Sequence, residues 1–363
     1  MLCKAAVVHS KDAKYVIENI EVAPPKANEV LIKMAASGLC HTDELGREQV
    51  IPVPLPVVLG HEGSGVVAEV GAAVKTINPG DHVVISFPSC GHCSTCLEGK
   101  THLCEDVFPL CFGGSMSDGT QRISLNGQGL SNFFGQSSFA EYAVSEERNV
   151  VVVDKDVDIA LLGPLGCGFQ TGAGTVLNGL QAKPGTSIVV FGCGAVGSAA
   201  VMGAKIAGCS QIIAVDIVPA KLALCEQLGA THTINGEETD DVIGQIKKIT
   251  SGGACYSIET TGIGEIVKQA IRSLKPLGHC AIVGVSGEIN IHVFEDIMMP
   301  ARRLEGFIQG NSIPKLFIPQ LIRYFKEGRF PIDKLIKFYK LEEINEAFAD
   351  VHKGITTKAV LRF

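Results

Sequence analysis

The chain has 363 residues, of which 46% are apolar and 19% charged, with 41 glycines, 13 cysteines and no tryptophan. This length and apolar content are enough for two domains with substantial cores, and they exclude a disordered, collagen-like or disulfide-stapled miniature protein. The 31 lysines and arginines against 38 aspartates and glutamates leave a formal net charge of −7. This charge gives the chain no generally positive surface that could neutralise phosphates, so we expect neither nucleic acid nor membrane as a partner.

The N-terminal residues indicate no secretory address. Lys4, His9, Lys11 and Asp12 interrupt the apolar stretch that a signal peptide needs. Apolar runs such as residues 188–191 are far shorter than the roughly eighteen residues that span a bilayer. We therefore expect a cytoplasmic protein. In that reducing compartment an odd number of cysteines favours thiols that bind metal, catalyse or fill the core over a disulfide framework.

Up to about residue 150 the sequence predicts short strands separated by turn residues. The strands expected are residues 30–34, 65–70 and 79–85. Their spacing is typical of a compact, antiparallel, barrel-like domain.

From about residue 185 strand-like runs alternate with helical ones. The strands expected are 187–191, 211–216, 255–259 and 279–284, and the helices are 196–207, 220–228 and 265–274. Repeated βα units imply right-handed crossovers and a parallel sheet. The remaining chain has helical periodicity at 314–325 and 341–350 and a last short strand at 359–361.

A glycine pattern lies where strand 187–191 meets the next helix. Gly192, Gly194 and Gly197, with Val196 before the third glycine, form G-x-G-x-x-G. The glycines permit a tight turn, close approach of a pyrophosphate and close helix–strand packing. Asp216 ends the following strand, where a carboxylate accepts from the ribose hydroxyls, so we expect NAD rather than NADP. Lys221 is either a further ribose contact or a solvated surface lysine.

One group of cysteines has the spacing C-x2-C-x2-C-x7-C, formed by Cys90, Cys93, Cys96 and Cys104. Four thiolates so close in sequence can close a tetrahedral shell, which leaves no position for a substrate, and this favours structural zinc. An iron–sulfur cluster is the main alternative, but no Cys-Pro follows. We expect the interleaved His92 and His102 to be surface residues.

A second set is dispersed and comprises Cys40, His61 and Cys167. Spacing alone does not connect these residues, because a lone buried cysteine usually acts as a small hydrophobe and a lone histidine is usually satisfied in the core. The motifs around them carry more information. They are Gly38-Leu-Cys-His-Thr-Asp43, Pro52-Val-Pro-Leu-Pro-Val-Val-Leu-Gly-His-Glu-Gly-Ser-Gly, Gln136-Ser-Ser-Phe-Ala and Leu161-Leu-Gly-Pro-Leu-Gly-Cys-Gly-Phe-Gln-Thr-Gly-Ala-Gly.

With these motifs in this order, the chain resembles the zinc-containing medium-chain alcohol dehydrogenases from end to end, and most closely their aryl-alcohol (benzyl-alcohol) branch. The resemblance implies an α/β fold: a GroES-like β-rich catalytic domain over residues 1–164, completed by 309–363, and a doubly wound, Rossmann, NAD-binding domain over 165–308. It also implies two zinc ions per subunit, one catalytic and one structural.

The resemblance implies that Cys40, His61 and Cys167 hold the catalytic zinc, a ligand set that suits an open site. Glu62 resembles the acid that approaches the metal during ligand exchange. Asp43 resembles the acid that orients the ligand histidine, and it is also placed to cap the helix that starts near Thr42.

The implied reaction is reversible oxidation of an alcohol by hydride transfer from a zinc-bound alkoxide to NAD⁺, with Thr42 hydrogen-bonded to the reacting oxygen. Two positions depart from the better-known members. Leu45 replaces the outer histidine of the proton relay, and His41 replaces an arginine against the pyrophosphate. Lys358 resembles the other basic pyrophosphate contact.

By resemblance, residues 105–121, Phe133, Phe134 and Val285 border the substrate. Residues 105–121 contain aromatic side chains and no lysine or arginine, which favours benzyl-type or other bulky, allylic primary alcohols over the anionic adduct of glutathione-dependent formaldehyde dehydrogenases. Plain core packing of these aromatics, a broad-specificity primary alcohol dehydrogenase and a non-catalytic NAD-binding regulator stay open as alternatives. Residues 280–285 and 298–307 lie where relatives pair, so we expect a homodimer or homotetramer.

Overall fold

The computed structural model describes residues 1–363, which divide into two compact units. Unit 1 comprises Met1–Cys167, Ile313–Ile322 and Ile332–Phe363, and unit 2 comprises Gly168–Ser312 and Arg323–Pro331. The boundaries expected from the sequence, after residues 164 and 308, lie close to the first two crossings. The grouping of Arg323–Pro331 with unit 2 has no counterpart in the sequence-based prediction.

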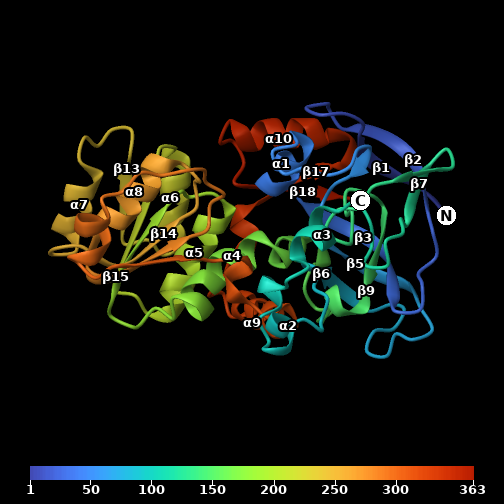
Figure 1. Cartoon of the computed structure of the whole chain (residues 1–363), viewed down its shortest axis with the longest axis horizontal. Coiled ribbons are helices and arrows are strands. Elements are labelled where there is room, and N and C mark those ends of the chain that lie inside the picture. Colours follow the sequence, from blue (N-terminus) through green and yellow to red (C-terminus); the bar gives the residue numbers. More distant parts are fainter. The chain divides into compact units, whose positions relative to one another are not determined.

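Unit 1 contains two mainly antiparallel sheets (Figure 1). The first has the order β4-β1-β2-β7-β8 and consists of β4 (Val57–Val58), β1 (Leu2–Val8), β2 (Val16–Val22), β7 (Ile123–Leu125) and β8 (Gln128–Leu130). The second has the order β10-β6-β5-β3-β18-β17, with β9 also on β3, and consists of β10 (Val150–Val153), β6 (His82–Ile85), β5 (Gly63–Val70), β3 (Glu29–Gly38), β18 (Lys358–Arg362), β17 (Ile336–Lys340) and β9 (Tyr142–Glu146).

The helices associated with unit 1 are short. They are α1 (His41–Arg47), α2 (Ser94–Leu97), α3 (Val107–Phe112), α10 (Ile344–His352) and the first part of α9 (Pro314–Lys326), which continues into unit 2. Helix α10 covers part of the core, where Tyr15 stacks on Phe348 with ring centroids 5.2 Å apart.

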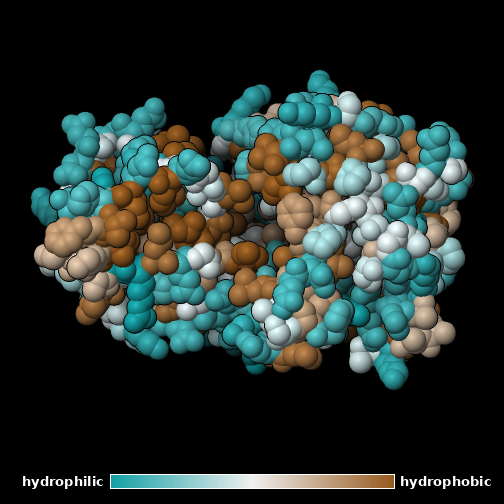
Figure 2. Space-filling model, viewed as in Figure 1, coloured by the Kyte–Doolittle hydropathy of each residue, from teal (hydrophilic) through white to brown (hydrophobic).

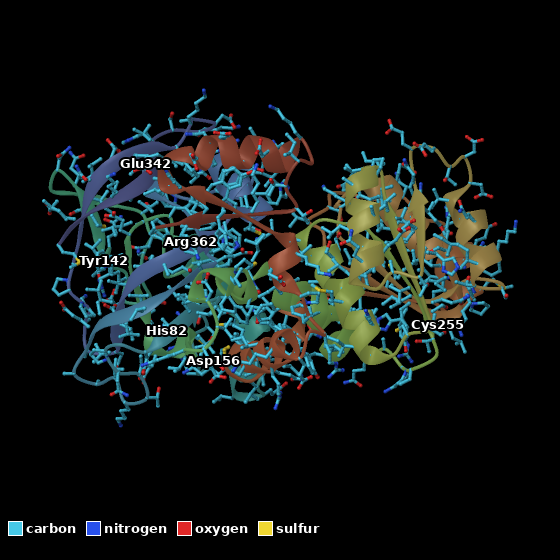
Figure 3. All side chains as sticks on the ribbon, turned by 180° about the vertical axis from the view of Figure 1, so that it is seen from behind. His82, Tyr142, Asp156, Cys255, Glu342 and Arg362 are labelled. Carbon is cyan, nitrogen blue, oxygen red and sulfur yellow. The ribbon has the colours of Figure 1, made fainter.

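Strand β18 completes the second sheet from far along the chain. It pairs antiparallel with β3, with Val360 opposite Gly38, and parallel with β17. At its end Arg362 pairs with Asp158 (Nη2–Oδ2, 2.6 Å) and lies over the ring of Phe338 (Figure 3). The pairing brings residues near 358 beside residues near 38.

Unit 2 is a parallel α/β layer, as expected from the sequence. Its sheet has the order β13-β12-β11-β14-β15-β16 and consists of β13 (His232–Asn235), β12 (Gln211–Asp216), β11 (Ser187–Phe191), β14 (Ala254–Glu259, which carries Cys255 in Figure 3), β15 (Leu274–Ile282) and β16 (Arg303–Gly306). The helices are α4 (Gly168–Gly174), α5 (Ala195–Ala207), α6 (Pro219–Leu228), α7 (Val242–Ile249) and α8 (Gly264–Arg272).

The two faces of this sheet are covered by different helices. Val189 and Phe191 join apolar residues of α7 and α8 in one buried cluster. Because side chains alternate along a strand, Ile188 and Val190 point to the opposite face, where α5 packs against β11. The helices predicted at 196–207, 220–228 and 265–274 are confirmed to within two residues at each end, whereas β13 and α7 were not predicted.

Shorter helical turns connect these elements. The 3₁₀ helices are Thr101–Leu103, Glu147–Asn149, Ile159–Leu161, Gly163–Gly166, Gln309–Asn311, Ile332–Leu335 and Leu341–Glu343, and the π-helical turns are Thr175–Gly179 and Val293–Met298. None of the helices combines the length and the apolar run needed to cross a bilayer. None of the 13 cysteines forms a disulfide.

Candidate active site and metal centres

Unit 1 brings together the dispersed set that spacing alone could not connect. Cys40 is the N-cap of α1, His61 lies between β4 and β5, and Cys167 follows the 3₁₀ helix Gly163–Gly166. Ligand atoms of these three residues and of Glu62 all lie within 4.8 Å of one another. The two thiols and the imidazole are the donor types that zinc takes in open, catalytic sites.

A hydrogen-bond network fixes the imidazole of His61. Asp43, fully buried, accepts from His61 Nδ1 (2.8 Å) and from the Gly60 amide (3.1 Å) through Oδ1. Its Oδ2 accepts from the Cys40 amide (2.9 Å), so the same carboxylate also caps α1. A carboxylate only accepts, so Nδ1 carries the proton and Nε2 keeps its lone pair. Nε2 is buried without a hydrogen-bond partner, as expected for a metal-binding nitrogen.

Glu62 is held by the last strand of the sheet. Its Oε2 pairs with Lys358 Nζ at 2.5 Å, both side chains are almost fully buried, and Lys358 Nζ also donates to the Leu39 carbonyl (2.7 Å). Burial raises the pKa of Glu62 to about 7, and the opposing charge of Lys358 limits the rise. Sequence reasoning assigned Lys358 to the cofactor pyrophosphate and missed this ion pair. The pyrophosphate contact stays a prediction.

The start of α1 places the remaining predicted reaction residues. Thr42 Oγ1 lies 3.8 Å from Cys40 Sγ. His41 is exposed, and its Nδ1 lies 3.9 Å from Oε2 of the buried Glu44, which also contacts His352. Leu45 is buried, so the position of the missing relay histidine is filled by an apolar side chain.

An aromatic cluster surrounds His61. The Phe134 ring stacks on the imidazole at 4.5 Å, the Phe133 ring meets it edge-on at 5.6 Å, and Phe112 contacts both phenylalanines. Val285 belongs to unit 2 and is exposed. The structure thus groups Phe133 and Phe134, two of the three predicted substrate residues, at His61.

The four-cysteine set is compact. Cys90 Sγ and Cys96 Sγ are 4.0 Å apart, as are Cys93 Sγ and Cys104 Sγ. Sulfurs about 2.3 Å from one tetrahedral zinc lie about 3.8 Å from each other, so the set fits that ion. The amides of Cys90 and Cys93 donate to Cys104 Sγ (3.2 Å) and Cys90 Sγ (3.3 Å).

The histidines between these cysteines differ in burial. His92 is exposed, as expected, but His102 is buried, so its prediction as a surface residue is wrong. The reason is that the 3₁₀ turn Thr101–Leu103 directs residue 102 inward, which cysteine spacing does not reveal.

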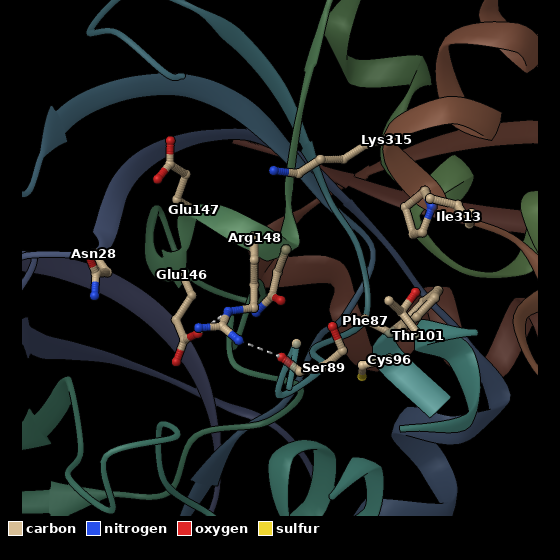
Figure 4. Close-up of a pocket in the computed structure, with 13 residues that line it drawn as sticks. Asn28, Phe87, Ser89, Cys96, Thr101, Glu146, Glu147, Arg148, Ile313 and Lys315 are labelled. Atoms are coloured by element: carbon tan, nitrogen blue, oxygen red, sulfur yellow. Dashed lines mark hydrogen bonds and ion pairs between the residues drawn. The ribbon is translucent and has the colours of Figure 1, made fainter. Parts of the chain in front are cut away.

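A cavity of about 550 Å³ lies beside this loop in unit 1 (Figure 4). Arg148 projects into it. Its Nε pairs with Glu146 Oε2 at 3.0 Å, and Nη1 donates to the carbonyls of Ser89 (3.4 Å) and Cys90. Arg148 therefore anchors the loop that begins at Cys90. Cys40, His61 and Cys167 do not line this cavity, which separates it from the group around His61.

In unit 2 the glycine turn has the geometry that dinucleotide binding requires. Gly192 has φ +89°, and a Cβ at Gly197 would lie 1.8 Å from the Gly192 carbonyl, so both positions need glycine. A Cβ at Gly194 would meet open space, which leaves room for a ligand at the backbone. The first amides of α5, next to Val196, are available to a phosphate.

Asp216 has a second role that the sequence did not indicate. Its Oδ2 accepts from the Cys193 amide (2.6 Å), and its Oδ1 accepts from the amides of Ile217 and Val218. The carboxylate thus ties the glycine turn to the end of β12. Lys221 lies on α6, half-buried. Cys193 has no exposed surface.

Comparisons with known proteins agree with both units. Residues 26–155 match the alcohol dehydrogenase GroES-like domain, and residues 195–326 match the zinc-binding dehydrogenase domain. The chain belongs to the zinc-binding, medium-chain alcohol dehydrogenase family, whose cofactors are zinc and NAD. The predicted fold class and enzyme class are thereby confirmed.

Individual relatives cover essentially the whole chain. It is 41% identical to geraniol dehydrogenase of Castellaniella defragrans over 99% of this chain and 97% of that protein. Among solved structures it is similar to benzyl alcohol dehydrogenase of Acinetobacter calcoaceticus (44% identity, TM-score 0.96, covering 100% and 99% of the two chains). It is also similar to an alcohol dehydrogenase zinc-binding domain protein of Burkholderia ambifaria (46%, TM-score 0.97, 100% and 99%).

Proposed function

We propose that this enzyme reversibly oxidises aromatic or bulky, allylic primary alcohols to aldehydes with NAD⁺. The observation that carries the proposal is the meeting of two thiols, Cys40 and Cys167, with the unpartnered, buried Nε2 of His61. Zinc, held by these three residues, would supply Lewis acidity toward the alcohol oxygen, and the nicotinamide would accept the hydride.

The chain's own residues orient the reactants and manage the proton. Asp43 fixes His61, and Thr42, beside Cys40, is placed to accept the hydroxyl proton and pass it toward the cofactor ribose. Leu45 offers no further acceptor, so we propose that the proton leaves from the ribose directly to water. Glu62 is available as an additional ligand during exchange at the metal, and its pairing with Lys358 holds it close by.

The aromatic cluster supports the substrate class. Phe112, Phe133 and Phe134 present apolar ring surface next to His61, and residues 105–121 provide no cation for an anionic adduct. The relatives named for geraniol and benzyl alcohol support the same class. We propose Val285 of unit 2 as a further substrate contact. Two alternatives are broad-specificity oxidation of primary alcohols and glutathione-dependent oxidation of formaldehyde. A comparison of substrates tests them.

For the cofactor, the glycine turn and Asp216 support NAD. A 2′-phosphate would be repelled by a carboxylate that is already engaged by three amides. His41, Lys221 and Lys358 complete the proposed contacts, with His41 and Lys358 toward the pyrophosphate.

We propose a second, structural zinc on Cys90, Cys93, Cys96 and Cys104, giving two ions per subunit. The four thiols can fill a tetrahedral shell, and their sulfur spacing supports this.

We also propose a cytoplasmic homodimer or homotetramer, since none of the cysteines forms a disulfide and unit 2 exposes apolar side chains (Figure 2). In unit 2 the edge strand β16 has a neighbouring strand on one side only and is exposed along its length. Leu277, Met298 and Met299 are exposed as well. Light scattering distinguishes the two assemblies.

Zinc analysis and an assay of NADH absorbance test the proposal. We expect two zinc ions per chain and higher kcat/KM for benzyl alcohol and geraniol than for ethanol or S-hydroxymethylglutathione. One zinc per chain and no alcohol-dependent NADH would indicate a non-catalytic NAD-binding protein. Best activity on S-hydroxymethylglutathione would overturn the substrate class.

A further inference from the structure

The segment Phe133–Ser138 has an unusual backbone. Phe134, Gly135 and Ser137 all have positive φ, at 52°, 57° and 52°. Such angles are costly for phenylalanine and persist only where surrounding contacts enforce them. One contact is internal, because Ser137 Oγ accepts from the Phe133 amide (2.9 Å). The others connect this segment to residues 61–63, where the chain enters β5.

Gln136 is the centre of that connection. Its side chain is 1% exposed, and its carboxamide spans the main chain on both sides of Glu62. Nε2 donates to the His61 carbonyl (3.0 Å), and Oε1 accepts from the Gly63 amide (3.2 Å). A single side chain therefore binds the backbone in the way that a neighbouring strand would.

The fit around Gln136 is close. A Cβ on Gly63 would lie 3.0 Å from Gln136 Oε1 and 2.8 Å from Ser138 Cβ, so the amide reaches the backbone only because residue 63 has no side chain. Nε2 also lies 3.5 Å from the Ser86 carbonyl. Both polar atoms of the buried amide therefore have partners, so the amide has few alternative positions.

The same segment also orients the imidazole ring. Phe134, two residues before Gln136, stacks on His61 at 4.5 Å, and Asp43 accepts a hydrogen bond from Nδ1. The main chain of His61 and its ring are therefore held by neighbouring residues of one strained segment. With this positive φ at Phe134, the segment stacks the Phe134 ring on the imidazole of His61 and at the same time hydrogen-bonds the main chain of His61 and Gly63 through Gln136.

We propose that Gln136 is a positioning residue for the catalytic metal site, acting through His61 and Glu62 without contacting the metal. The inference rests on the proposed function, since it needs zinc on Cys40, His61 and Cys167. It does not concern the four-cysteine site, which lies on a separate loop. Outer-shell contacts of this kind change metal affinity by about 10–100-fold when lost.

The test compares Gln136→Met, nearly the same length without hydrogen bonds, with wild type. Gln136→Asn is the second variant; it keeps an amide that is too short to reach both main-chain groups. Asn345→Leu is the matched control, because Asn345 also binds one residue's main chain twice, accepting from the Tyr15 amide (3.0 Å) and donating to its carbonyl (2.9 Å), with no contact to a metal ligand.

The readouts are the rate of zinc loss to a chelator and the visible absorption of enzyme with cobalt at the open site. In Gln136→Met we expect one of the two zinc ions to leave about 10–100-fold faster, the other to leave at the wild-type rate, and the cobalt bands to shift. Gln136→Asn should give a smaller change in the same direction, and Asn345→Leu should leave rates and bands unchanged.

Wild-type zinc loss and wild-type cobalt bands in both Gln136 variants would overturn the inference. So would equal effects of Asn345→Leu, which would reduce the role of Gln136 to general stability. Failure of the proposed function is a different result, namely wild-type protein that holds a single zinc ion and oxidises no alcohol.

Discussion

Replacing Asp43 by asparagine tests the hydrogen-bond network that orients the proposed zinc ligands. The carboxylate accepts three hydrogen bonds, two at Oδ1 from His61 and Gly60 and one at Oδ2 from Cys40. Asparagine offers only one acceptor atom. If its oxygen keeps the place of Oδ1, its NH₂ group faces the Cys40 amide, so at least one buried donor loses its partner.

An unsatisfied buried donor costs about 1–3 kcal/mol. If the lost hydrogen bond weakens the orientation of the proposed zinc ligands, zinc affinity falls about 10–100-fold, which is a loss of about 1.4–2.7 kcal/mol of binding free energy. The two ranges agree, so we expect a loss of this size in Asp43→Asn, with less alcohol oxidation at limiting zinc. The reverse amide orientation would leave two donors facing the NH₂ group and is less favourable.

Competition with a chelator of known affinity measures the effect. The four-cysteine site serves as an internal control, because it should retain its zinc in the variant. Asp241→Asn is the control substitution, since Asp241 also accepts an amide at a helix start (Gly244, 2.8 Å) but lies in unit 2. Wild-type zinc affinity in Asp43→Asn would refute the reasoning.

Four further predictions concern stability, cofactor binding and proton transfer. Arg122→Met leaves Glu29 buried without its partner (Nη2–Oε1, 2.6 Å) and should lower the free energy of unfolding in urea by about 3–5 kcal/mol, while Glu29→Gln in the same chain should restore part of it. Burial would raise the pKa of Asp118, but hydrogen bonds donated to it prevail and lower that pKa. The contribution of Asp118 to the free energy of unfolding is therefore present above the pKa of this group in the unfolded chain, and it is lost as pH falls. Asp118→Asn should flatten the acid side of the stability curve, and an unchanged slope would contradict this. His41→Arg adds a bidentate cation and should tighten NADH about tenfold in a binding titration. Leu45→His should change turnover and its pH profile, and unchanged values would contradict the missing relay.

Local features of the sequence were the most predictable. The cysteines from Cys90 to Cys104 lie within one loop, so their spacing alone indicates a site, and the glycine turn is likewise set by neighbouring residues. The βα alternation of unit 2 follows from hydrophobic periodicity, although β13, with four residues, is too short to stand out and α7 was not predicted.

The contacts that sequence reasoning missed join distant segments. Cys40, His61 and Cys167 meet only because of how the sheets pair, and they were grouped by resemblance rather than by spacing. No sequence pattern marks Gln136 as a partner of His61, or Glu62 as a partner of Lys358, because each pair joins segments that are far apart in the sequence. Burial of His102 depends on the direction of a single turn.

The position of β18 has a consequence for biosynthesis. Strand β3 and the residues around Cys40 and His61 are translated long before β18, which supplies Lys358 to Glu62 and completes their sheet. The four-cysteine loop, by contrast, needs only residues within one short stretch. As the chain emerges from the ribosome, the four cysteines are therefore all available early, whereas the surroundings of His61 are complete only after residues 358–362 have been made. If both sites bind zinc as proposed, we expect the topology of unit 1 to let the four-cysteine loop bind its ion first.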